Sequence, residues 1–123
     1  MRQGWRGPLF RAAFSLAFFG AYRISELVAP SRSEPGQACL QVEDVALGSD
    51  RLEVFLRRSK TDQEGKGLTT VIWGSPAQGC CAVRLLQRYL SVRPIRPGPL
   101  FIHGDGSYLS KYQFRAVFRA ALH

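Results

Sequence analysis

Two cations in this sequence have the neighbours that a phosphate-binding site needs. Arg23 follows a long apolar run, residues 9–19, and Glu26 stands one helical turn after it. An arginine anchored beside a core helix has little freedom to move, and its charged guanidinium offers a flat fork of donors that matches a phosphate. Lys60 lies in a turn-rich segment, residues 57–67, where an ammonium can close over a phosphate and protonate a leaving alkoxide. Together the two cations predict a site that handles phosphate.

Each of these residues also has an ordinary structural interpretation. Arg23 can be a helix-terminal arginine that pairs with Glu26, and Lys60 can be a solvated turn lysine. Glu26 can orient the guanidinium or simply form an ion pair with it, and we favour support over proton transfer. Lys66 stands between two glycines in the same segment as Lys60 and is a second candidate for the loop cation.

A further set of cations can follow a nucleic-acid backbone. The residues expected to contact DNA are Arg57, Arg58, Lys66, Lys111, Arg115 and Arg119. The last three recur at intervals of four and form one stripe on a predicted helix, which fits a solvated face as well as a DNA-tracking face. Contacts of this kind position a protein on the duplex without reading its sequence.

Charge and cysteine content narrow the class of partner. Lys and Arg number 17 against 9 Asp and Glu, for a formal net charge of +8 in 123 residues. Such a surplus favours a polyanionic partner, nucleic acid before an anionic membrane surface. The three cysteines, Cys39, Cys80 and Cys81, are a poor disulfide framework, and the histidines are isolated. We therefore expect free thiols in an intracellular, reducing compartment, with no metal and no cofactor.

The hydrophobic pattern predicts one α+β domain over residues 1–123. An apolar helix with Pro8 in its first turn runs to Phe19 and should be buried on all sides, although a targeting segment is the alternative there. A short helix follows over residues 23–28. Three strands, at residues 39–42, 51–56 and 68–73, predict a small antiparallel sheet.

The second half of the sequence is expected to be helical at both ends. A helix is predicted over residues 82–90, then an extended linker over 93–99 and a buried extended piece over 100–102. The last helix has the clearest start signal, because Ser110 can cap it and Gln113 can complete a capping box. The fold class is therefore a helical core with a small three-stranded antiparallel sheet.

This order of elements resembles the catalytic domain of tyrosine recombinases, also called phage-integrase-like recombinases. The stretch Gly20-Ala-Tyr-Arg-Ile-Ser-Glu-Leu27 resembles the family's first-arginine box, in the form seen in eukaryotic mobile elements, where glycine precedes arginine by three. Ser59-Lys-Thr-Asp62 with Gly65-Lys-Gly67 resembles the lysine hairpin. Pro99-Leu-Phe101 followed by Leu109-Ser-Lys-Tyr-Gln-Phe114 resembles the segment that leads into the second catalytic box.

The resemblance implies DNA strand breakage and rejoining, as in recombination and integration. A tyrosine attacks a DNA phosphate in that family, two arginines stabilise the charged transition state, and a lysine protonates the departing 5′-oxygen. Arg23 would match the first arginine, Lys60 the lysine, and Glu26 the acidic residue that supports the arginine. The implied partners are DNA and an intact recombinase or a homo-oligomer on DNA, not a membrane, and the implied location is intracellular, in the nucleus if the source is eukaryotic.

The sequence departs from the family pattern at its end. The histidine–two residues–arginine box and the nucleophilic tyrosine have no counterpart before His123, and the tyrosines present lie in the wrong region. We therefore expect a truncated catalytic core that is inactive alone. The alternatives are a non-enzymatic, basic, nucleic-acid-binding remnant of a mobile element, or an unstable product whose first and last helices leave apolar surface uncovered.

Overall fold

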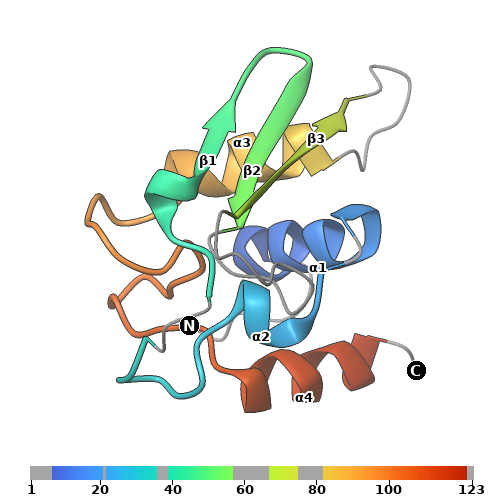
Figure 1. The fold of residues 1–123 in the computed structure, drawn as a ribbon. Helices are drawn as coiled ribbons and strands as arrows, with labels where there is room; N and C mark the ends of the chain where they lie inside the picture. The colour runs from blue at the N-terminus through green and yellow to red at the C-terminus, as the bar shows by residue number, and fades with distance from the viewer. Residues whose placement is uncertain (1–6, 21, 36–38, 57–66, 75–81, 122–123) are drawn as a thin grey trace.

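The computed structural model describes residues 7–20, 22–35, 39–56, 67–74 and 82–121, and it has the expected α+β architecture. Its elements, in chain order, are α1 (Pro8–Gly20), α2 (Ile24–Leu27), a short 3-10 turn η1 (Val42–Asp44), β1 (Val45–Leu47), β2 (Arg51–Leu56), β3 (Leu68–Trp73), α3 (Ala82–Val92) and α4 (Lys111–Ala121). In Figure 1, α1 lies between the sheet and α4.

The sheet is an antiparallel meander in the order β1-β2-β3. Leu52 lies opposite Ile72 and Leu56 opposite Leu68, so the segment between β2 and β3 leaves and returns at neighbouring positions. Along β2 the exposure alternates, with Leu52, Val54 and Leu56 buried against the helices. This is the period of two that the sequence predicted for a sheet with one face on the core.

The first predicted strand was wrong. Residues 39–42 are not a strand of the sheet, because β1 begins only at Val45. Leu40 instead donates its N–H to the carbonyl of Glu26 at 2.7 Å and accepts one from Leu100 at 2.9 Å. The segment is therefore extended and buried, as its alternating pattern suggested, but Leu40 bonds to Glu26 of α2 and to the loop residue Leu100 instead of to a strand. Asp44 then ends it, since its carboxylate accepts the N–H of Gln41 at 3.0 Å and stabilises η1.

Helix α1 supplies the centre of the core, but only over its first three turns. Leu9, Phe10 and Leu16 are almost fully buried and belong to the same cluster as Leu86 of α3. Phe18 is 80% exposed, so the expectation of a helix buried on all sides fails at its C-terminal end. Across the described residues, no helix is long and apolar enough to cross a membrane.

Helix α4 begins where the sequence predicted, with half of the predicted cap. The Ser110 hydroxyl accepts the N–H of Gln113 at 3.2 Å, as an N-cap does. The side chain of Gln113 does not complete the box, because its Oε1 lies 2.6 Å from Nε2 of His103. Further along the helix, Phe114 and Phe118 meet the ring of Phe14 on α1 edge-on, with centroids 5.1 and 5.4 Å away. These rings attach α4 to the core.

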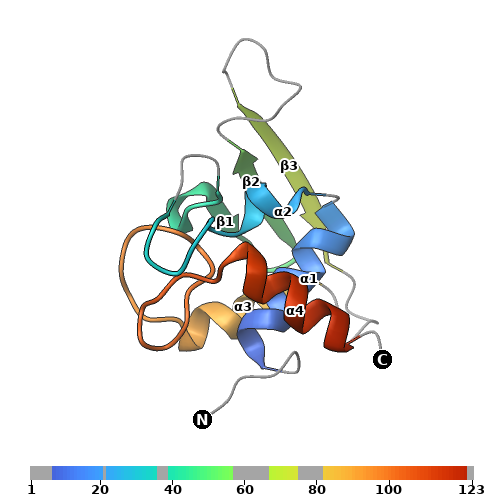
Figure 2. The same cartoon turned by 90° about the horizontal axis from the view of Figure 1, so that it is seen from below.

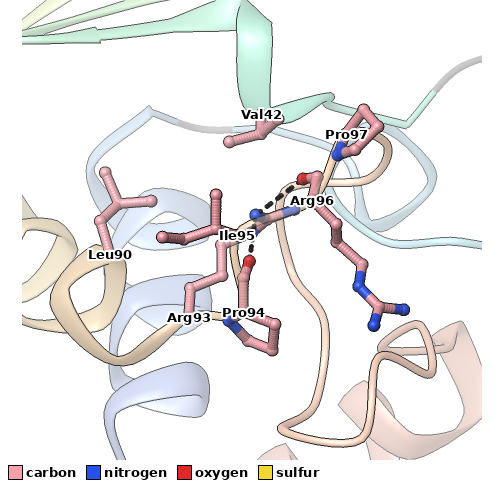
Figure 3. Close-up of a pocket in the computed structure, with 7 residues that line it drawn as sticks. All are labelled: Val42, Leu90, Arg93, Pro94, Ile95, Arg96 and Pro97. Carbon is pink, nitrogen blue, oxygen red and sulfur yellow. Dashed lines mark hydrogen bonds between the residues drawn. The ribbon is translucent and has the colours of Figure 1, made fainter.

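The predicted linker over residues 93–99 is a loop closed around one buried arginine. Arg93 is 8% exposed, and its guanidinium donates to four backbone carbonyls, those of Pro94, Arg96, Pro99 and Leu100, at 2.8 to 3.0 Å. Figure 3 shows two of these bonds, beside a cavity of about 430 Å³. Since the carbonyls occupy its donors, Arg93 is a structural residue and cannot serve as a phosphate ligand.

Replacing Arg93 should therefore destabilise the fold without removing an exposed charge. For Arg93→Ala we expect a loss of about 3 kcal/mol or more in the free energy of unfolding, because four carbonyls lose a charged donor. Urea denaturation followed by circular dichroism measures it. Arg88→Ala, at an exposed position of α3, is the matched control and should change the same quantity by less than about 0.5 kcal/mol. Equal effects of the two substitutions would contradict the structural role.

Candidate phosphate-binding site

Arg23 stands at the N-terminus of α2 with its backbone held and its side chain exposed. It is the N-cap residue, with φ −74° and ψ 152°, and it follows directly on the buried Tyr22. Its carbonyl accepts the N–H of Glu26 at 3.0 Å. Among the described residues no ion pair engages the guanidinium. The fork of donors is therefore free to meet a phosphate from a fixed point on the backbone.

Glu26 supports Arg23 through the backbone and not through the guanidinium. Its Oε1 accepts the backbone N–H of Arg23 at 2.8 Å, which satisfies a donor that the start of a helix leaves open. Neither the predicted contact of Glu26 with the guanidinium nor an ion pair between the two side chains is found among the described residues, and the supporting role of Glu26 stays a prediction. The carbonyl of Glu26 also accepts the N–H of Leu40, so the residue ties α2 to the rest of the fold.

Four of the predicted cations, Lys60, Arg57, Arg58 and Lys66, lie outside the described residues. The structure describes the strands on either side of them. β2 ends at Leu56 and β3 begins at Leu68, and the two residues are paired. The segment that carries Lys60 therefore leaves the sheet at this end, and the approach of Lys60 to Arg23 stays a prediction.

Lys111, Arg115 and Arg119 lie on α4, as predicted. Backbone hydrogen bonds connect the start of this helix to the segment after α2. Ala29 donates its N–H to Leu109 at 3.1 Å and accepts the N–H of Lys111 at 3.0 Å. Figure 2 shows α2 beside the first turn of α4. Lys111 is half-buried, whereas Arg115 and Arg119 are exposed. The stripe is thus available to a backbone of phosphates, although a solvated face would look the same.

Two buried tyrosines are excluded as nucleophiles. Burial raises the pKa of Tyr22, the neighbouring Thr70 hydroxyl partly offsets this, and the Glu26 carboxylate raises it further. Burial likewise raises the pKa of Tyr89, whose hydroxyl bonds the backbone of Leu100 and Ile102. A phenol buried in the core is out of reach of a phosphate at the surface.

The described residues hold no group of three or more His, Cys, Asp or Glu side chains placed to bind a metal ion.

Cys39 is a free thiol, buried against Pro35, whose carbonyl lies 2.9 Å from its Sγ. Burial raises the pKa of this thiol, and the Asp44 carboxylate raises it further. The described part of the site has one exposed cationic side chain, that of Arg23, on a backbone held by hydrogen bonds. Such a side chain can stabilise negative charge.

The cap made by Glu26 can be tested by its effect on stability. For Glu26→Ala we expect a loss of about 1 kcal/mol in the free energy of unfolding, because the N–H of Arg23 loses its acceptor. Glu26→Gln keeps an acceptor oxygen and should lose less. Glu34→Ala, at an exposed loop position, is the control. A loss no greater for Glu26→Ala than for the control would show that the cap contributes nothing.

Comparison with known proteins agrees with the resemblance at the level of the family. Over 91 residues, 74% of this chain, the sequence is 35% identical to a protein described as "Integrase/recombinase xerD homolog" from Selenomonas ruminantium. The chain covers 24% of that protein and so spans about a quarter of it. No family model and no solved structure matches. This relative gives no support to the eukaryotic mobile-element branch, but the similarity does support a relationship between this chain and the tyrosine recombinases.

Proposed function

We propose that this chain binds DNA as the front part of a tyrosine-recombinase catalytic domain, with Arg23 as the arginine that contacts the reacting phosphate. The observation that carries the proposal is the state of Arg23, whose backbone is capped by Glu26 at 2.8 Å while its guanidinium is exposed. Phosphoryl transfer depends mainly on positioning and on stabilising negative charge, and a fixed guanidinium provides both. The net charge of +8 supports DNA as the polyanion.

The remaining roles follow from the same chemistry. Lys60 would donate a proton to the departing 5′-oxygen, and Glu26 would hold Arg23 through its backbone N–H. Arg57, Arg58, Lys66, Lys111, Arg115 and Arg119 would contact phosphates along the duplex. The second arginine and the nucleophilic tyrosine match nothing in these 123 residues, so we assign neither role to a residue of this sequence. An intact recombinase or a homo-oligomer on the same DNA remains the proposed partner.

A second candidate function is DNA binding without chemistry. Arg115 and Arg119 favour it, since both are exposed on one face of α4 and neither needs a nucleophile nearby. In that case each cation would contribute a similar, salt-sensitive share of the affinity. The two functions differ in how strongly binding depends on Arg23.

The dependence on Arg23 can be measured by fluorescence anisotropy with a labelled duplex of about 30 base pairs, at several salt concentrations. We expect Arg23→Ala to weaken binding about tenfold, since an anchored arginine on a phosphate contributes about 1.4 kcal/mol or more. Arg119→Ala should weaken it about twofold and lower the salt slope by about one unit. Arg88→Ala is the control. If Arg23→Ala weakens binding no more than Arg119→Ala does, the diffuse binder is the correct function.

The inactivity of the isolated chain is a separate prediction. Incubated with a nicked suicide DNA substrate, the chain alone should form no covalent protein–DNA adduct, because it has no residue that matches the nucleophile. Denaturing gel electrophoresis of labelled DNA detects the adduct at high sensitivity. An adduct on this chain would show that one of its own tyrosines attacks DNA and would overturn the proposed division of roles.

A further inference from the structure

Gly20 and Tyr22 form a close contact directly before Arg23. Gly20 is the last residue of α1, and the ring of Tyr22 lies against its Cα. A Cβ at position 20 would overlap Cε2 of the ring and would lie 2.6 Å from Cδ2 and 2.9 Å from Cζ. Gly20 is helical, so the requirement is for space and not for an unusual backbone angle. Any larger residue at position 20 would displace the Tyr22 ring.

The Tyr22 side chain reaches from this contact into the core, toward β3. It is 9% exposed and belongs to the same buried cluster as Ile72 of β3. Among the described residues, its buried hydroxyl has no hydrogen-bond partner, and the hydroxyl of Thr70 is its neighbour. A buried phenol without a bond gives no reason to prefer tyrosine to phenylalanine for stability.

Thr70, the neighbour of the Tyr22 hydroxyl, lies on β3, so the Tyr22 ring lies between Arg23 and this strand. Thr70 pairs with Val54 in the sheet and stands two residues after Leu68, where the chain returns from the segment that carries Lys60. Tyr22 is covalently next to Arg23 and packs against this strand. The ring therefore connects the backbone of the arginine to the strand that follows the lysine segment.

We propose that Tyr22 is a positioning residue of the phosphate site. Its ring, seated on Gly20, sets the place of Arg23 relative to β3. This inference rests on the proposed function in so far as Arg23 contacts DNA. The ring carries the effect, because the hydroxyl makes no hydrogen bond. If Tyr22 only filled space, a smaller apolar residue would lower stability and leave Arg23 unaffected.

The test combines DNA affinity with the side-chain signal of Arg23. The variants are Tyr22→Phe, Tyr22→Leu and Gly20→Ala, each alone and with Arg23→Ala. Phe101→Leu, at a buried ring that packs on Tyr89, is the matched control. Duplex binding is measured on folded protein by anisotropy. The Nε–Hε resonance of Arg23, assigned by its loss in Arg23→Lys, is recorded by NMR without DNA.

We expect Tyr22→Phe to bind DNA like the wild type and to unfold at the same or a higher temperature. Tyr22→Leu and Gly20→Ala should each weaken binding by nearly the factor lost in Arg23→Ala, and adding Arg23→Ala should weaken it little further. Both should shift the Arg23 resonance, whereas Phe101→Leu should lower only the unfolding temperature. If Gly20→Ala does not fold, Tyr22→Leu decides.

Two results would overturn the inference. One is an unchanged Arg23 resonance in Tyr22→Leu, which contradicts positioning whether or not the protein binds DNA. The other is a set of affinity losses that multiply in the double variant, which indicates independent effects. A wild-type affinity that Arg23→Ala leaves intact would instead refute the proposed function, while a shifted resonance would still support the contact between Tyr22 and Arg23.

Discussion

The constraint on which the rest of this structure depends is the fixed backbone at Arg23. A guanidinium on a free loop would lose conformational entropy whenever it bound a phosphate. Here the chain enters Arg23 from a buried tyrosine and leaves it through a helix whose first turn is capped by Glu26 at 2.8 Å. Much of the order that binding requires is already present in the fold. The exposed charge is then available at one place, which is what charge stabilisation of a phosphate needs.

The rest of the fold holds that place through backbone hydrogen bonds. The carbonyl of Glu26 accepts the N–H of Leu40, and Ala29 bonds both Leu109 and Lys111 at the start of α4. The loop after α3 is closed on the Arg93 guanidinium, and its residue Leu100 bonds back to Leu40. Segments far apart in the sequence thus meet around α2. The same small domain thus holds two different arginines. Arg93 is buried and bonded to backbone carbonyls, whereas the side chain of Arg23 is exposed.

The sequence predicted those features that depend on local pattern. The bounds of α1, β2 and β3 agree closely, because apolar periodicity and Pro8 and Gly20 mark them. The strand at residues 39–42 failed, because an alternating pattern reports extended backbone but cannot say whether the partner is a strand or a loop. The prediction that the first helix is buried on all sides failed at Phe18. The composition of a helix does not show where the elements that cover it end. The capping box of α4 was half right, because Gln113 has a better partner, His103, ten residues away in the chain.

The candidate site shows the same division. Arg23 and Glu26 were proposed from their spacing, and their roles stay predictions. The contact that the structure shows between them, carboxylate to backbone N–H, depends on the geometry of a helix start. The role of Tyr22 had no signal beyond the glycine two positions earlier, and a glycine at that position fits the plain end of a helix equally well. Arg93 carried no signal that separated it from the surface arginines, because its burial follows from the path of a loop.

We propose that Arg23 and Lys60 meet around one phosphate of a DNA backbone. The most direct measurement is NMR of the arginine Nε–Hε and lysine ammonium groups during titration with a short duplex at low salt. If the two cations share a phosphate, the resonances of Arg23 and Lys60 will shift together at the same DNA concentrations, while that of Arg88 does not move. Shifts confined to Arg115 and Arg119, with Arg23 and Lys60 unchanged, would contradict it.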